Sequence, residues 1–284
     1  MKYRDAYEYG KTTLEKASVP SFATDARLLL EFCCKTETSM LFSHPDYKLS
    51  DREKDEYKHS IELRAQRIPL QHITKQQEFM GLNFVVNQDV LIPRQDTEFV
   101  VEQCLESVEQ GMNILDMCTG SGCIILSLLH YTKDCSGVGA DISTKALDVA
   151  RKNASICREE NVKFIQSDLF EKLPNHEKYD IIISNPPYIE TTEISKLESE
   201  VMNHDPFIAL DGKEDGLYFY RKIIAIAPHY LKEGGKLFLE IGYQQADAII
   251  KLMANAGFEN IIRKKDYAGL DRMVTGTRTE GNYV

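Results

Sequence analysis

The sequence predicts an α/β fold: a doubly wound, mostly parallel seven-stranded sheet with a small all-helical N-terminal domain and a β-hairpin linker. Three observations carry this prediction. Beyond residue 112, β-branched segments alternate with helical ones, which is typical of parallel sheets covered by helices. Residues 2–75 show only helical spacing, and a glycine separates two short strand-like segments just after them. We therefore expect domains at 1–75 and 94–284, joined by residues 76–93.

Composition limits the classes of protein that fit. The 284 residues are enough for a sizeable core. Seven cysteines without a Cys-x-x-Cys spacing, and histidines that form no cluster, predict neither a disulfide framework nor a metal site. No apolar run reaches membrane-spanning length and the start has no signal-peptide pattern, so we expect a soluble, cytoplasmic protein.

Charge is unevenly distributed along the chain. Residues 1–75 hold 13 Lys/Arg and 12 Asp/Glu, a net +1, whereas residues 76–284 hold 21 and 32, a net −11. A large contact with a phosphate backbone needs clustered Lys and Arg. The acidic larger part therefore argues against nucleic acid as the main partner, without excluding it.

The N-terminal domain is expected to be a small helical bundle. Helical stripes cover residues 3–17, which Gly10 interrupts, and 26–33, and a short turn follows at 40–42. Ser50 to Glu53 reads as a capping box that opens a last helix, which Pro69 ends. These helices carry no recognisable chemistry and are interpreted as a small bundle that packs on, or recognises, something else; we expect it to be a substrate-recognition domain.

The connecting region and the larger domain follow in a regular order. Residues 78–86 predict two short strands about Gly81, and Asp96 or Thr97 is expected to cap the helix that runs to Leu105. Strands are expected at 112–117, 137–142, 162–166, 179–184, 236–241, 260–264 and 272–277, and helices at 123–131, 144–156 and 246–256.

A nucleotide-type cofactor site is predicted where the first three strands of this sheet end. The turn of Cys118, Thr119, Gly120, Ser121 and Gly122 lets a ligand approach the backbone at a helix N-terminus. Asp141, beside Ile142, can accept the ribose hydroxyls, and Asp168 can reach an adenine amino group with Leu169 or Phe170 against the ring. Position 125 is Ile where a dinucleotide fingerprint has its third glycine, so the run from Asp116 to Gly122 favours S-adenosylmethionine.

The fourth strand ends in a rigid polar corner, Asn185-Pro186-Pro187-Tyr188. The two prolines cannot donate backbone hydrogen bonds, so the strand stops there. Asn185 Oδ1 and the Pro186 carbonyl can accept both N–H groups of a planar NH2, whose lone pair is thereby aimed, and Tyr188 can stack on the planar group. The corner predicts a transferase that acts on a planar nitrogen.

Nearly the whole chain resembles the HemK/PrmC family of S-adenosylmethionine-dependent methyltransferases, which modify the glutamine of the Gly-Gly-Gln motif in peptide chain release factors. The likeness rests on stretches 78–84, 91–98, 116–122, 185–189, 209–217 and 265–272. It implies a seven-stranded methyltransferase sheet, a release factor as protein substrate and a role in translation termination. We expect the protein to act as a monomer.

The resemblance also implies roles for individual residues. Asn185, Pro186 and Tyr188 are the expected catalytic residues, and Pro187, Arg94 and Glu98 are expected to join them in binding the substrate. Glu240, on the fifth strand, is interpreted as organising the site rather than acting as a base. The expected cofactor-binding residues are Asp116, Cys118, Thr119, Gly120, Ser121, Gly122, Asp141, Ile142, Asp168, Leu169 and Asn185.

Three departures from the family pattern affect the site. Cys118 replaces a usual glycine and is tolerated if its φ stays negative. Gln95-Asp96 replaces Pro-Glu and keeps the acidic character, and Leu169 replaces a common aromatic, which puts an adenine contact there in question. Two alternatives stay open: a DNA or RNA amino-methyltransferase acting on a flipped base, and a non-catalytic cofactor-binding protein.

Overall fold

The computed structural model describes residues 1–279, which divide into two compact units. The first comprises residues 1–76 together with 198–204, and the second comprises 77–197 and 205 onward. None of the helices within the described range combines the length and the apolar character needed to span a lipid bilayer. All seven cysteines are free thiols.

The first unit is all-helical, as predicted. Its elements are α1 (Tyr3–Lys16), α2 (Phe22–Cys34), α3 (Thr38–Ser43), α4 (Asp51–Ala65), α5 (Leu70–Thr74) and α9 (Ser199–His204). The capping box is present, since Ser50 Oγ accepts from the Glu53 amide and the Glu53 carboxylate accepts from the Ser50 amide. Gly10 does not interrupt α1: a Cβ there would lie 2.0 Å from Tyr57 Oη, so glycine lets α1 pack closely on α4.

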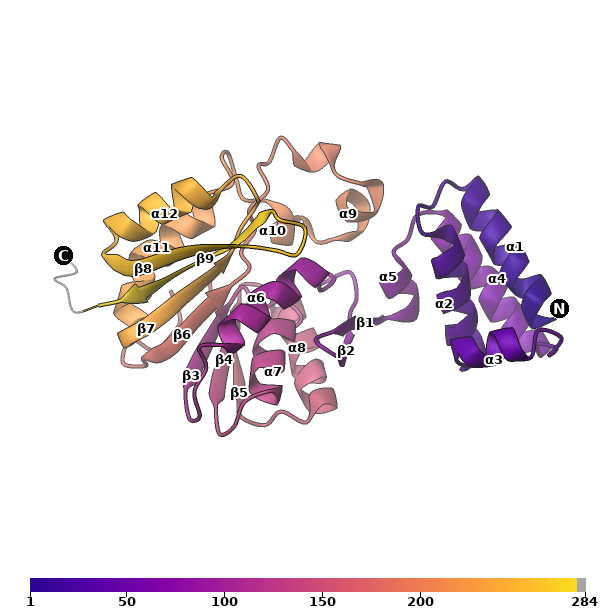
Figure 1. The fold of residues 1–284 in the computed structure, drawn as a ribbon, viewed down its shortest axis with the longest axis horizontal. Coiled ribbons are helices and arrows are strands. Elements are labelled where there is room, and N and C mark those ends of the chain that lie inside the picture. The colour runs from indigo at the N-terminus through magenta and orange to yellow at the C-terminus, as the bar shows by residue number, and fades with distance from the viewer. Residues whose placement is uncertain (280–284) are drawn as a thin grey trace. The chain divides into compact units, whose positions relative to one another are not determined.

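The second unit contains the predicted mostly parallel seven-stranded sheet, in the order β5-β4-β3-β6-β7-β9-β8 (Figure 1). Strands β3 to β7 run parallel, and β9 and β8 are antiparallel additions. The strands are β3 (Asn113–Met117), β4 (Ser136–Asp141), β5 (Val162–Gln166), β6 (Tyr179–Ser184), β7 (Leu231–Glu240), β8 (Phe258–Lys265) and β9 (Asp271–Arg278).

Helices cover both faces of this sheet, and the alternation of β6 shows how. Ile181 and Ile183 belong to the core formed with α6 (Gln95–Leu105) and α7 (Cys123–His130), whereas Ile182 belongs to the core formed with α11 (Tyr218–Tyr230) and α12 (Ala246–Asn255). The continuous apolar run therefore has a simple physical reason, because both faces of this strand are buried. The remaining helices are α8 (Thr144–Cys157), α10 (Phe207–Leu210) and the 3-10 turn η1 (Ile194–Lys196).

The hairpin of β1 (Gln76–Phe79) and β2 (Leu82–Val85) turns at Met80-Gly81, as expected from Gly81. Phe79 and Phe84 are buried in the core beside α6 and α7, so the hairpin packs as part of the second unit. Several elements depart from the sequence prediction. The helices α5, α9, α10 and α11 and the turn η1 were not expected. The helix α6 begins at Gln95, with Arg94 rather than Asp96 or Thr97 at its N-cap. The strand β7 begins at Leu231, upstream of the glycine pair that we expected to precede it.

Candidate active site

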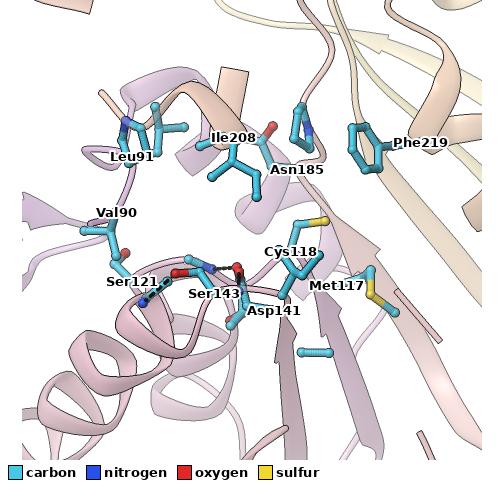
Figure 2. A pocket seen from close by; sticks show the side chains of 18 of the residues that line it. Val90, Leu91, Met117, Cys118, Ser121, Asp141, Ser143, Asn185, Ile208 and Phe219 are labelled. Carbon is cyan, nitrogen blue, oxygen red and sulfur yellow. Dashed lines mark hydrogen bonds between the residues drawn. The ribbon is translucent and has the colours of Figure 1, made fainter. Parts of the chain in front are cut away.

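A cavity of about 320 Å³ opens at the carboxyl ends of β3, β4, β5 and β6. Parallel strands bring their ends to one edge of a sheet, which is why residues far apart in sequence meet there. Figure 2 shows Asp141 and Ser143 on one side of the cavity, Asn185 and Phe219 on another, and Val90 and Leu91 across from them. Every residue that lines it belongs to the second unit.

The turn after β3 forms the floor of the cavity. Cys118, Thr119, Gly120 and Ser121 line it, but Asp116 and Gly122 do not. Asp116 is fully buried, and its Oδ2 accepts a 2.6 Å hydrogen bond from Thr119 Oγ1. Burial raises the pKa of Asp116 to about 7. Its observed contact thus holds the turn, and a direct contact with a cofactor stays a prediction.

Cys118 has a φ of +64°, so the condition under which a cysteine was expected to be tolerated here, a negative φ, is not met. The left-handed region costs a residue with a Cβ about 1–2 kcal/mol, which explains why glycine suits this position. The strain is compatible with a formed turn, because Thr119 N donates to Ala140 O and Gly122 N donates to Thr119 O. The Cys118 thiol faces the cavity (Figure 2).

Asp141 lies at the end of β4 with both carboxylate oxygens bound to the backbone. Oδ2 accepts from Gly120 N and Oδ1 from Ser143 N, each at 2.9 Å. Burial raises its pKa, and these two bonds counteract that rise. Each oxygen keeps a second lone pair, so the carboxylate can still accept hydroxyl donors of a ligand.

The end of β5 contributes Asp168 and Leu169 to the cavity. Leu169, buried at a φ of +48°, lines the wall. Phe170 instead stacks on Tyr230 at 4.8 Å between ring centroids, inside the core. Of the two residues considered for an aromatic ligand ring, only Leu169 therefore borders the space.

The polar corner follows β6. Asn185 and Pro187 line the cavity, whereas Pro186 and Tyr188 do not. Asn185 Nδ2 donates to Thr97 Oγ1 at 3.3 Å. That contact leaves Asn185 Oδ1 available as an acceptor at the cavity, as the predicted role requires. Catalytic roles for Pro186 and Tyr188 stay predictions.

The backbone of Tyr188 contacts Gln245 and two glycines of the 209–217 stretch. Gln245 Nε2 donates to Tyr188 O at 3.0 Å and to Gly216 O at 3.2 Å. Added Cβ atoms at Gly212 and Gly216 would lie 2.7 Å from Tyr188 Cα and 2.4 Å from Tyr188 O. The two glycines of the 209–217 stretch are thus explained by close packing on the corner.

Glu240 ends β7 next to this corner and is only 2% exposed. Burial raises its pKa to about 7, while the Thr97 hydroxyl and the Asn185 amide, acting as hydrogen-bond donors, and the charge of Arg272 counteract the rise. Arg272 is in turn held by Asp96, at 3.1 Å, and by Asp266, also at 3.1 Å.

The two other expected substrate-binding residues differ in position. Arg94 lines the cavity and forms an ion pair of 2.5 Å with the buried Asp205. Glu98 does not line it; its carboxylate accepts the Met80 amide at 2.6 Å and so supports the hairpin turn. Substrate contact by Glu98 stays a prediction.

Several lining residues were missed by sequence reasoning. Tyr218 and Phe219 come from the start of the unexpected helix α11, and Ile208 comes from α10. Lys213, also in the lining, lies within a stretch quoted for the family resemblance but was given no role. Nothing in their local sequence separates them from core or surface residues, because only the chain crossing over the sheet edge places them there.

Two family models match the chain: the PrmC N-terminal domain over residues 5–74 and a methyltransferase domain over residues 108–269. A release factor glutamine methyltransferase from Clostridium acetobutylicum is 39% identical over 282 residues, which cover 98% of this chain and 99% of that protein. Another from Fusobacterium nucleatum subsp. nucleatum is 38% identical over 273 residues, or 95% of this chain and 77% of that protein. A solved methyltransferase from Pyrococcus furiosus, 16% identical, aligns with a TM-score of 0.53 over 70% of this chain and 90% of that one, a likeness of fold.

Proposed function

This chain belongs to the family of release factor glutamine methyltransferases, and we propose that it transfers a methyl group from S-adenosylmethionine to the side-chain nitrogen of the Gly-Gly-Gln glutamine in peptide chain release factors. The observation that carries the proposal is the position of Asn185. Its amide lies in the wall of the same cavity as the glycine-rich turn and Asp141, so an acceptor for a planar NH2 borders a cofactor-sized space.

The residues present fit S-adenosylmethionine. The Asp141 carboxylate has spare lone pairs for the ribose hydroxyls, and Asp168 and Leu169 supply a polar and an apolar neighbour for a purine. Ser121, just before the first turn of α7, and Gly120 offer the cofactor carboxylate a turn at a helix N-terminus. When bound, the cofactor supplies an electrophilic methyl group on a sulfonium.

The chain's own contribution is positioning. Asn185 Oδ1 and the Pro186 carbonyl accept the two N–H groups of the glutamine amide, which turns the nitrogen lone pair toward the methyl group. Alignment of this kind contributes up to about 7–11 kcal/mol to lowering a barrier. A carbon–nitrogen bond forms as the carbon–sulfur bond breaks, and the nitrogen, strongly acidic once alkylated, loses its proton to water. No strong base is required.

The rest of the molecule serves recognition. We assign the helices of residues 1–75 to contact with the release factor, and residues 76–93 to the link with the catalytic domain at 94–284. A monomer suffices, because one chain provides every residue of the cavity. The reaction is placed in the cytoplasm, where release factors act on the ribosome.

The test combines the purified protein with methyl-labelled S-adenosylmethionine and a release factor. A matched release factor with Gln→Ala in its Gly-Gly-Gln motif is the control, and DNA and ribosomal RNA are offered separately. Label in the wild-type factor alone is the expected result. Label in nucleic acid alone would overturn the substrate and favour an amino-methyltransferase of bases, whereas cofactor binding without transfer to any substrate would point to a non-catalytic protein.

A further inference from the structure

A second layer of polar residues stands behind Asn185. In the pairing of β6 with β7, Ser184 lies opposite Leu239, so the next residues along the two strands, Asn185 and Glu240, leave the sheet side by side. Glu240 Oε2 is buried and, within residues 1–279, has no hydrogen-bond partner. A buried carboxyl group without full pairing is costly, so a functional reason for its presence is expected.

Resting on the proposed function, we propose that Glu240 and Thr97 are positioning residues that fix the amide of Asn185 so that Oδ1, and not the NH2 group, faces the substrate glutamine. Thr97 is 3% exposed and accepts from Asn185 Nδ2 at 3.3 Å. As hydrogen-bond donors, the Thr97 hydroxyl and the Asn185 amide also lower the pKa of the Glu240 carboxyl group, against the rise that burial causes.

The direction of each hydrogen bond in this arrangement follows from which groups can donate and which can only accept. An ionised carboxylate only accepts hydrogen bonds. In the proposed arrangement the single proton of the Thr97 hydroxyl points to the ionised Glu240, so Thr97 Oγ1 accepts from Asn185 Nδ2, the contact that the structure shows. The Asn185 NH2 group is therefore drawn inward and its oxygen is directed to the cavity, where the glutamine NH2 needs an acceptor.

Protonation of Glu240 reverses the direction of these hydrogen bonds. A protonated carboxyl group donates to Thr97 Oγ1, which frees the Thr97 proton to bind Asn185 Oδ1 and turns the Asn185 NH2 group toward the substrate. Two NH2 groups then oppose each other, and transfer stops. The titratable and charged groups that act on Glu240 lie on α6, α7, α11, β9 and the segment after β6: Asp96, Cys123, Tyr220, Arg272 and Tyr188.

The kinetic test follows label transfer to the release factor between pH 5.5 and 9. In the wild type, kcat should fall on the acid side with a midpoint near pH 7, where burial places the pKa of Glu240. In Glu240→Gln, kcat should no longer fall on the acid side, and at pH 8 it should be about tenfold or more lower than in the wild type. Thr97→Val should lose about tenfold in kcat with an unchanged cofactor Kd, and Thr97→Ser should recover to within about threefold, because it restores the hydroxyl.

Ser127→Ala is the matched control, since Ser127 is a buried hydroxyl on α7 with no partner among residues 1–279; its kcat should stay within about twofold of the wild type. A Glu240→Gln enzyme that keeps the fall in kcat on the acid side and the wild-type rate, or a Thr97→Ser enzyme as slow as Thr97→Val, would overturn the proposal.

A second measurement does not depend on turnover. In protein labelled with 15N-asparagine, the side-chain NH2 signal of Asn185, identified by its loss in Asn185→Asp, should titrate near pH 7 in the wild type and stay constant in Glu240→Gln. A pH-independent signal in the wild type contradicts the proposed control of the Asn185 amide by Glu240. If the wild type transfers no label at any pH, the proposed function fails. The NMR measurement still tests whether Glu240 orients the Asn185 amide.

Discussion

Buried charge is treated differently in the two compact units. In the helical unit, the Arg64 guanidinium donates to Asp25 at 2.7 Å, to Glu200 at 2.9 Å and to the Ile68 carbonyl at 3.2 Å. Ser21 Oγ adds a 2.8 Å bond to Asp25. In the catalytic unit, one oxygen of Asp116 and one of Glu240 are buried with no partner among the described residues, and burial raises both pKa values to about 7.

The difference separates a structural use of buried charge from a functional one. A fully paired cluster is locked, because removing any member leaves a charge unsatisfied. A partly paired carboxyl group keeps the capacity to change its protonation or its partner, and such groups concentrate at functional sites. Four substitutions follow in order of decreasing free-energy effect: two change the buried charged residues Arg64 and Glu240 that define this contrast, and two change uncharged residues of the cavity, Asn185 and Cys118.

Arg64→Leu should have the largest effect, a loss of about 3–5 kcal/mol of stability in the helical unit, because Asp25 and Glu200 lose their buried partner. Urea unfolding followed by circular dichroism measures it. Arg52→Leu is the control: Arg52 forms an exposed pair with Glu56, so its loss should cost far less stability than the loss of Arg64. Equal losses in the two variants would show that the Arg64 cluster is not locked.

Asn185→Ala should lower turnover by about tenfold to a thousandfold, the range for losing one preorganised polar contact. Affinity for S-adenosylmethionine should change much less, because the turn and Asp141 are untouched. Steady-state kinetics with a release factor, together with calorimetric titration of the cofactor, separates the two quantities. Asn161→Ala, at an exposed position outside the cavity lining, should behave as the wild type. Near wild-type turnover in Asn185→Ala would remove Asn185 from the mechanism.

Glu240→Gln should change stability in a pH-dependent way. The pKa of Glu240 is raised in the folded protein, so between the unfolded pKa and about 7 the folded protein holds a proton that the unfolded chain has lost. The stability of the wild type therefore falls as the pH rises through that range. The variant should therefore gain on the wild type as pH increases from 5 to 8, by at most about 3 kcal/mol. Thermal unfolding at several pH values measures the gain, and a constant difference would contradict a raised pKa.

Cys118→Gly should have the smallest effect, a net stabilisation of up to about 1 kcal/mol, because relief of the left-handed strain is partly offset by the greater freedom of glycine in the unfolded chain. Differential scanning calorimetry detects it as a higher Tm. Cys118→Ala keeps a Cβ at the same φ and should show no such gain. A Tm that rises equally in both variants would attribute the effect to the thiol rather than to the backbone.

Sequence alone determined the elements whose signals are local. The buried run of β6, the glycine-rich turn and the Ser50 capping box each follow from side-chain periodicity or backbone restriction within a few residues. The order of strand ends then predicted that Asp141, Asp168 and Asn185 meet, because parallel strands share one edge; all three line the cavity.

Only the tertiary structure decided the rest. The left-handed φ of Cys118 depends on the turn that surrounds it, and Glu98 turns to the Met80 amide because the hairpin packs beside α6. Phe219 reaches the cavity on a helix that no local pattern predicted. Strand pairing and burial place Glu240 behind Asn185, with one carboxylate oxygen that has no hydrogen-bond partner among residues 1–279. These features depend on contacts between residues distant in sequence, and the desolvation that shifts a pKa exists only once the core has closed.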